Sequence, residues 1–234
     1  MVRLLPYPAE ALISMIPRVL EPEAMDTTEE ASEYDAMDHS IVNQRFVQDF
    51  LVARGSCGAG TILDVGTGTA LIPIELARVD SGAKILAVDL AEAMLEMARR
   101  NVEHAGWSDR IRLERVDAKG LKYPDASFEA VISNSIIHHI PAPSPALAEM
   151  VRLVAPGGSL FVRDLARPES DAEVDQLVAM YAAEETQRAQ ALFSDSLHAA
   201  LTLEEVRSIV SSLGLPPADV TMTSDRHWTW SLRR

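Results

Sequence analysis

Apolar strands alternate with helices through the middle of the chain, and this alternation constrains its fold more than any other feature. The segments TILDV, KILAVD and AVISN are almost continuously apolar, which is typical of strands covered on both faces. Strands alternating with helices form a parallel sheet with helices on both sides. Strands are predicted at 61–65, 84–89, 111–116, 128–134 and 158–164, with helices at about 70–79, 91–105 and 144–153.

The N-terminal residues 1–55 are predicted to be helical. Thr27 and Glu30 have the spacing of a capping box, and Gly55 ends the apolar periodic stretch. The apolar residues of this stretch are expected to share one helical face: Ile41, Val42, Phe46, Val47, Phe50 and Leu51.

The C-terminal part is predicted to extend the sheet. A helical stretch follows Pro168 to about residue 191, and a second helix begins at Thr202, which has a capping-box partner in Glu205. Two short strands are expected around a turn at 224–225. The sequence therefore predicts an open, mostly parallel sheet that closes with an antiparallel pair.

Charge and composition favour a small-molecule partner. The chain has 21 Lys and Arg against 35 Asp and Glu, a formal net charge of −14, which repels nucleic-acid phosphates and anionic lipid surfaces. One cysteine, Cys57, excludes an intrachain disulfide and a multi-thiolate metal site. Neither a secretion signal nor a membrane span is predicted. We expect a cytoplasmic protein that binds neither nucleic acid nor membrane.

A glycine turn follows the first strand, in the segment ILDVGTGTALIPIEL. Strand, glycine turn and helix in this order usually hold a nucleotide-like cofactor. A dinucleotide fingerprint requires a third glycine three positions after Gly68, but Leu71 stands there. Asp64 would also lie close to the negative charge of a pyrophosphate. The same carboxylate suits a cofactor that carries an ammonium and a sulfonium.

Acidic residues end three successive strands. Asp89 follows Gly68 by 21 residues (89 minus 68), close to the spacing of about 20 at which an acidic residue reaches ribose hydroxyls. Asp117 follows the third strand, as Asp64 ends the first. Ligands of open parallel sheets bind beyond the carboxyl ends of the strands, so the three acids are expected to share one crevice.

These motifs resemble those of the class I S-adenosylmethionine-dependent methyltransferases over roughly 61–167. The segments SNSIIHHI and LVAPGGSLFV resemble the later motifs of that family. The resemblance implies a Rossmann-like, mostly parallel seven-stranded sheet with helices on both faces and a C-terminal antiparallel hairpin. It implies a lid segment at 1–55 and a cofactor-binding domain at 56–234. Thr69 and Ala70 depart from the family, in which a further glycine is common.

The resemblance also assigns residues to the cofactor, S-adenosyl-L-methionine. The turn would hold its methionine part, Asp89 its ribose hydroxyls, Leu90 and Asp117 its adenine, and Tyr34 would close over it. The full set expected at the cofactor is Tyr34, Asp64, Gly66, Thr67, Gly68, Asp89, Leu90, Asp117, Ala118, Ser133 and Asn134.

Methyl transfer from a sulfonium needs mainly an acceptor aligned for in-line displacement. A hydroxyl or thiol acceptor must also lose a proton, and His138, just beyond the fourth strand, is the predicted base or orienting group. His139 is expected to pack, and packing of both histidines is an equal alternative. No metal site is predicted, because adjacent histidines rarely reach one ion.

The predicted function is methyl transfer to a small-molecule acceptor. One alternative is an NAD(P)-dependent oxidoreductase, against which Asp64 and Leu71 argue. Another is a non-catalytic cofactor-binding protein with a methyltransferase fold. Trp228 and Trp230 face the same way in the last strand, which indicates sheet packing or a homodimer contact. The sequence does not define the acceptor.

Overall fold

The computed structural model describes residues 16–23, 26–55 and 60–234. Cys57 and the first fifteen residues lie outside this part. The strands are β1 (Thr61–Val65), β2 (Lys84–Asp89), β3 (Ile111–Arg115), β4 (Phe128–Asn134), β5 (Val154–Leu165), β6 (Val220–Met222) and β7 (His227–Arg233). The α-helices are α1 (Thr28–Ala36), α2 (Ser40–Arg54), α3 (Leu71–Val79), α4 (Glu92–Ala105), α5 (Ser144–Leu153), α6 (Asp171–Tyr181), α7 (Gln187–Ala199) and α8 (Leu203–Ser212).

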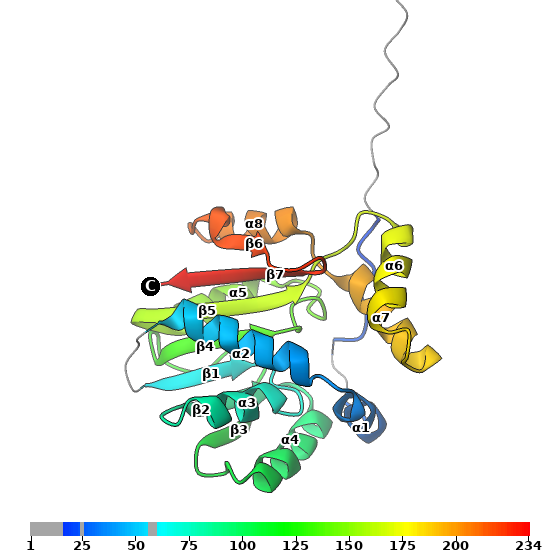
Figure 1. Cartoon of the computed structure of the whole chain (residues 1–234). Coiled ribbons are helices and arrows are strands. Elements are labelled where there is room, and N and C mark those ends of the chain that lie inside the picture. The colour runs from blue at the N-terminus through cyan, green and yellow to red at the C-terminus, as the bar shows by residue number, and fades with distance from the viewer. Residues whose placement is uncertain (1–15, 24–25, 56–59) are drawn as a thin grey trace, which may run out of the picture.

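The described strands form one seven-stranded sheet in the order β3-β2-β1-β4-β5-β7-β6 (Figure 1). Strands β1 to β5 are parallel, whereas β7 pairs antiparallel with β5 and with β6. This confirms the predicted Rossmann-like fold with its C-terminal antiparallel pair. The chain adds β2 and β3 on one side of β1 and then β4 and β5 on its other side. The region beyond the carboxyl ends of β1 and β4 is therefore a topological switch point, where open α/β sheets bind ligands.

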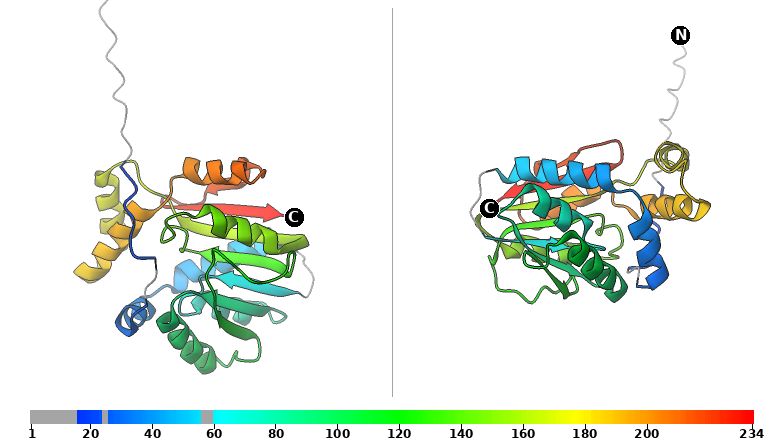
Figure 2. Two further views of the ribbon diagram at one scale, coloured as in Figure 1. Left: turned by 180° about the vertical axis from the view of Figure 1, so that it is seen from behind. Right: turned by 60° about the horizontal axis from the view of Figure 1, so that its bottom comes forward.

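Helices cover both faces of the sheet, as the apolar strands predicted (Figure 2). Alternate residues of β1 point to opposite faces: Ile62 packs in the core with α2, α3 and α4, whereas Leu63 packs in the core with α5 and α8. Asp64 is two residues after Ile62 in β1, so its side chain points to the same face of the sheet as that of Ile62. The first strand therefore presents its carboxylate on the side covered by α2 and α3.

Both tryptophans of β7 belong to the core on the α5 side. Trp228 and Trp230 are fully buried among the apolar side chains of that layer. Their burial agrees with the predicted sheet packing.

The N-terminal segment differs most from its prediction. Residues 16–22 contain no helix, and the helical part is divided into α1 and α2. The Thr27–Glu30 capping box of α1 is present. In α2, Phe46 and Phe50 are buried, but Ile41 is 79% exposed, because at 3.6 residues per turn it lies about 140° around the helix from Phe46.

Two other elements differ in length. The stretch after Pro168 forms two helices, α6 and α7, which lie beyond the end of β5 (Figure 1). The fifth strand begins at Val154 rather than at residue 158, with a register shift against β4 between Phe128 and Ala130. Neither difference changes the order of the strands. No helix in the described part of the chain is long and apolar enough to span a bilayer.

Replacing Trp230 by alanine should remove the largest kind of side chain in the core and lower the free energy of unfolding by about 3–5 kcal/mol. Val52→Ala on the exposed side of α2 is the control, because Val52 is 83% exposed and its loss should change stability by less than about 0.5 kcal/mol. Urea denaturation measures both. Equal effects of the two substitutions would contradict the packing described.

Candidate active site

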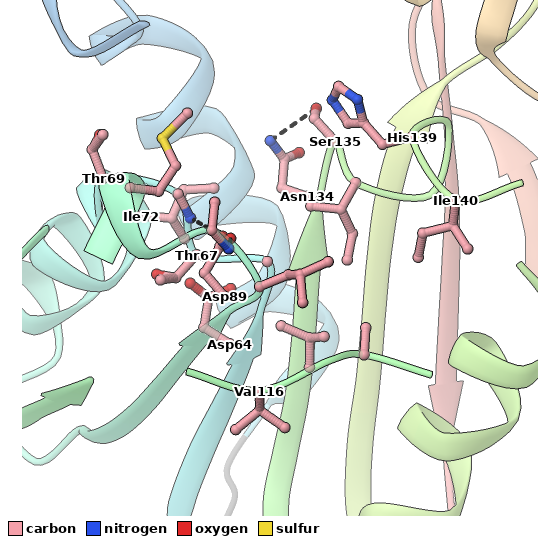
Figure 3. A pocket seen from close by; sticks show the side chains of 18 of the residues that line it. Asp64, Thr67, Thr69, Ile72, Asp89, Val116, Asn134, Ser135, His139 and Ile140 are labelled. Carbon is pink, nitrogen blue, oxygen red and sulfur yellow. Dashed lines mark hydrogen bonds between the residues drawn. The ribbon is translucent and has the colours of Figure 1, made fainter. Parts of the chain in front are cut away.

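A cleft lies at the switch point, beyond the carboxyl ends of β1, β2 and β4 (Figure 3). The space between its walls, counted together with the open solvent at its mouth, is about 1030 Å³. Of the residues predicted to hold the cofactor, all but Ser133 line it. The other lining residues are Glu23, Asn43, Val65, Thr69, Leu71, Ile72, Ala91, Met94, Val116, Lys119, Ser135, Ile136, His139 and Ile140.

The glycine turn between β1 and α3 forms the floor of the cleft. Gly66 has a φ of +77°, and a Cβ there would overlap the Ile136 side chain. Both requirements select glycine. Ala70, at the N-terminus of α3, has a φ of +64°, a left-handed position that residues other than glycine seldom adopt.

Asp89 fixes the turn from the end of β2. Its Oδ2 accepts a hydrogen bond of 2.8 Å from the Gly68 amide, and its Oδ1 accepts one of 2.9 Å from the Ala91 amide. Burial raises the pKa of Asp89, although these backbone donors oppose the shift. A carboxylate has about four lone-pair sites, so Asp89 can also accept hydrogen bonds from a ligand's hydroxyls.

Asp64 is the most unusual group in the cleft. Its side chain is buried, and its Oδ2 has no hydrogen-bond partner among the described residues. Burial raises the pKa of Asp64 to about 7, and the nearby Asp89 charge adds to the shift. A buried carboxylate without a partner destabilises a fold. A cationic ligand would remove this penalty.

Helix α1 places Tyr34 beside the glycine turn. The Tyr34 ring would lie 3.8 Å from a Cβ at Gly68, and it stacks on His39 with ring centroids 4.6 Å apart. Burial raises the pKa of Tyr34 to about 12, and three nearby carboxylates add to this shift. The phenol is therefore a neutral donor near pH 7. Asn101 of α4 holds α1 in place by a hydrogen bond of 2.7 Å to Asp35.

The rim on the opposite side is formed by the segment after β3. Asp117 accepts a hydrogen bond of 2.9 Å from the Lys119 amide. Burial alone would raise the pKa of Asp117, but the amide and ammonium of Lys119 hold it below its usual range. Lys119 also pairs with Glu23 of the N-terminal segment. This ion pair joins the N-terminal segment to the rim.

The sequence analysis expected His138 to face the cleft and His139 to pack in the interior, but the structure places them the other way round. His139 borders the cleft (Figure 3), whereas His138 is not among the lining residues. His138 is buried with its Nδ1 2.5 Å from Oδ1 of Asp164 at the end of β5. Burial alone would lower the pKa of His138, but the Asp164 carboxylate raises it above its usual value. Burial lowers the pKa of His139 to about 4, and the neighbouring His138 adds to this shift.

Ser133 and Asn134 end β4 but have different surroundings. The Ser133 hydroxyl donates to the Val65 carbonyl at 2.8 Å and is fully buried, so it joins β4 to β1. Asn134 lines the cleft and donates to the Ser135 hydroxyl at 3.1 Å. Neighbouring side chains of a strand point to opposite faces of the sheet. This alternation is the sequence signal that could have distinguished Asn134, which lines the cleft, from Ser133, which does not.

The sequence analysis did not single out three polar residues that line the cleft. Glu23 and Asn43 belong to no recognised motif, and Ser135 lies within the SNSIIHHI segment without having been assigned a role. Ser135 has a φ of +56°, which an ordinary serine seldom adopts. Glu23 reaches the cleft only through tertiary packing of an irregular segment, for which the sequence carries no local signal.

Comparisons with known proteins agree with the fold and the motifs. Residues 63–162 match the family described as a methyltransferase domain. The chain is 26% identical over 149 residues to the ubiquinone/menaquinone biosynthesis C-methyltransferase of Marinomonas sp. (strain MWYL1), which covers 60% of this chain and 58% of that protein. It is 35% identical over 111 residues to the demethylmenaquinone methyltransferase of Thermus thermophilus, covering 47% and 50%.

Another relative has a different type of acceptor. The phosphatidylethanolamine N-methyltransferase of Cereibacter sphaeroides is 32% identical over 111 residues, which cover 47% of this chain and 50% of that protein. The chain thus spans between half and 58% of the length of these three relatives.

Solved structures share the fold at low sequence identity. A SAM-dependent methyltransferase from Aquifex aeolicus superposes with a TM-score of 0.62 at 18% identity, covering 88% of this chain and 97% of that one. The [4+2]-cyclase SpnF superposes with a TM-score of 0.57 at 18% identity, covering 82% and 81%. Residues 63–162 thus match a methyltransferase-domain family, and the chain has the fold of S-adenosylmethionine-dependent methyltransferases.

The Asp64→Asn variant should be more stable than the wild type in the absence of cofactor, and increasingly so at higher pH. The pKa of Asp64 in the fold, about 7, lies above the value of about 3.9 of a free carboxyl. The folded state therefore holds the proton more tightly, and the Asp64 contribution to stability falls as pH rises from about 4 to about 7. Between pH 5.5 and pH 8 the advantage of the variant should grow by about 2 kcal/mol, or about 5 °C in Tm.

Thermal unfolding of the two proteins at several pH values checks this trend. Asp109→Asn is the matched control, because Asp109 is exposed and its replacement should leave the pH dependence unchanged. A stability difference between Asp64→Asn and the wild type that does not vary with pH would contradict the assignment.

Proposed function

We propose that this protein transfers the methyl group of S-adenosyl-L-methionine to a small-molecule acceptor by direct in-line displacement. The observation that carries the proposal is the buried, unpartnered oxygen of Asp64, next to a carboxylate at the end of β2. A cleft with this charge favours a cationic adenosine compound over a dinucleotide with an anionic pyrophosphate. The family match supports the same cofactor.

The residues of the cleft fit this cofactor. In the proposed mode of binding, Asp64 and the turn at 66–68 hold its methionine part, and the free lone pairs of Asp89 accept the ribose hydroxyls. Leu90, with Asp117 and Ala118, contacts the adenine. Thr67 and Thr69 each have a buried hydroxyl without a partner among the described residues, and both line the cleft. They can satisfy their hydrogen bonds with a polar ligand.

The bound cofactor supplies an electrophilic methyl group, so the chain has to position the acceptor and exclude water. We assign the second task to Tyr34 and α1, which cover the glycine turn. The Tyr34 phenol stays protonated near pH 7 and can donate a hydrogen bond to the ligand.

His139, not His138, is the histidine that we place at the acceptor. Its pKa of about 4 keeps the ring neutral at pH 7, so it can accept a hydrogen bond from a hydroxyl of the acceptor. Such a weak base removes a proton poorly, which favours an orienting role. His138, the residue predicted from the sequence, is enclosed by Asp164 and can act only through its neighbours.

We infer an acceptor with an apolar body from the isoleucine side chains of the cleft. Ile72, Ile136 and Ile140 line it, and Figure 3 shows Ile140 on the side of His139 and Ile72 on the opposite side, near Thr67. The names of the relatives include quinone methyltransferases and a phospholipid methyltransferase, and both kinds of acceptor are largely apolar. The cytoplasmic location and the homodimer stay predictions from the sequence.

The carboxylate at the end of β2 should control cofactor affinity. Calorimetry with S-adenosylhomocysteine should show saturable binding to the wild type, and Asp89→Ala should weaken it by about 10- to 100-fold, the usual worth of a charged hydrogen bond. Asp109→Asn should bind like the wild type. The proposal fails if the intact protein does not bind the compound, or if NADH gives a saturable fluorescence titration instead.

Affinity for S-adenosylmethionine should rise as the pH increases from 5.5 to 7.5. Asp64 must lose its proton to pair with the cationic ligand, and its pKa in the free protein is about 7. The rise should be about 25-fold in the wild type, because the ionised fraction of a group with this pKa grows by about that factor. Because Asn is neutral throughout this range, Asp64→Asn should show weak binding without the rise. Calorimetry at three pH values measures it, and a pH-independent wild-type affinity would contradict the role of Asp64.

A further inference from the structure

Glu21, His138 and His139 form a compact group beside the cleft, at the back of the site described above. Oε1 of Glu21 lies 3.4 Å from Nε2 of His138 and 3.1 Å from Nδ1 of His139. The ligand atoms of all three side chains lie within 4.8 Å of one another. The two imidazole rings have centroids 4.2 Å apart at an angle of 34°. Adjacent histidines therefore converge on one carboxylate here instead of pointing apart.

These separations suit a metal ion. Ligand atoms at about 2.0–2.1 Å from a tetrahedral zinc ion lie about 3.3 Å from one another. The two distances from Glu21 bracket this value. Two imidazoles and one carboxylate are also a donor set that divalent transition metals prefer.

A second carboxylate orients His138 in the way that metal-bound histidines require. Asp164 accepts hydrogen bonds from the Ile137 amide at 2.5 Å and the Leu165 amide at 2.7 Å, so it is held rigidly. Its contact with Nδ1 of His138 places the proton on that nitrogen. Nε2 then turns its lone pair toward Glu21. Carboxylate, histidine and metal in this order are a recurrent arrangement in metalloproteins.

The group is incompletely satisfied by the protein alone. Nδ1 of His139 is buried without a hydrogen-bond partner among the described residues. The Glu21 side chain is 10% exposed, and the Ser196 hydroxyl lies 3.3 Å from each of its oxygens. Nitrogen lone pairs that face a buried carboxylate repel it unless a cation or a proton lies between them.

Arg18 holds the N-terminal segment that carries Glu21. Its guanidinium donates to the carbonyls of His138 and Ile140, both at 3.0 Å, and of Ala199 at 2.7 Å. The positive charge of Arg18 opposes a nearby cation, whereas the carboxylates of Glu21 and Asp164 favour one.

We infer that Glu21, His138 and His139 bind one divalent transition-metal ion of the zinc type. Three protein ligands leave a coordination position open. His139 also lines the cleft, so in the metal-bound protein an oxygen of the acceptor takes that position, in place of a direct hydrogen bond to His139. This last step rests on the proposed methyl transfer, whereas binding of the metal does not.

Titration of tag-free, full-length protein with metal ions tests the inference. After treatment with a chelator and dialysis, Co²⁺ should produce visible d–d absorption that saturates at one equivalent, and Zn²⁺ should displace it. Glu21→Gln and His139→Ala should each weaken Zn²⁺ binding by about 100-fold or more, because losing an outer-shell partner already costs 10- to 100-fold. His104→Ala is the matched control, since His104 is exposed on α4 and should leave the affinity unchanged.

Two results would overturn the inference. One is the absence of saturable binding, which would mean that a proton shared by Glu21 and His138 occupies the space. The other is binding that is equal in the wild type and in both ligand variants, which would place the metal elsewhere. Circular dichroism verifies that the variants fold. Calorimetry with S-adenosylhomocysteine on the same samples separates a failure of the metal site from a failure of the cofactor site.

Discussion

The site depends on a carboxylate that the fold buries without a partner. Asp64 ends the central strand β1, and alternation along that strand turns it toward α2 and α3, away from bulk water. The oxygen atoms of Asp89 meanwhile hold two backbone amides around the glycine turn. Burying a carboxyl in this way destabilises the free protein. In the proposed mode of binding, a cationic ligand removes this penalty, so the residue that favours ligand binding lowers the stability of the free protein.

The N-terminal segment completes what the sheet leaves open. Tyr34 lies beside the glycine turn, Glu23 pairs with Lys119 at the rim, and Glu21 reaches the two histidines after β4. These contacts join residues far apart in sequence, and Arg18 anchors the segment through backbone carbonyls. Carbonyls are available at almost any chain position, so such an anchor needs no particular residue on the opposite side. The sheet therefore forms the floor of the cleft, and the N-terminal segment contributes to its rim.

Much of this arrangement could be predicted from the sequence because it is locally encoded. Continuous apolar strands, a turn that needs Gly66 and acids at successive strand ends are short-range patterns, and they led to the sheet and the cofactor side of the cleft. Glu21 and Glu23 were not foreseen, because they lie in irregular backbone positioned by tertiary contacts alone. The sequence analysis expected His138 at the acceptor, whereas His139 is the histidine that lines the cleft. The position of His138 depends on Asp164, 26 residues away, which no local rule connects to it.

The titration of Asp64 itself tests the central claim most directly. Carbon-13 NMR of the labelled aspartate carboxyls, assigned with Asp64→Asn, would follow its protonation with and without S-adenosylmethionine. The account predicts a pKa of about 7 in the free protein and a value well below that in the complex, because the bound cation favours the ionised form. An ordinary value near 4 in the free protein, or an unchanged value on binding, would contradict it.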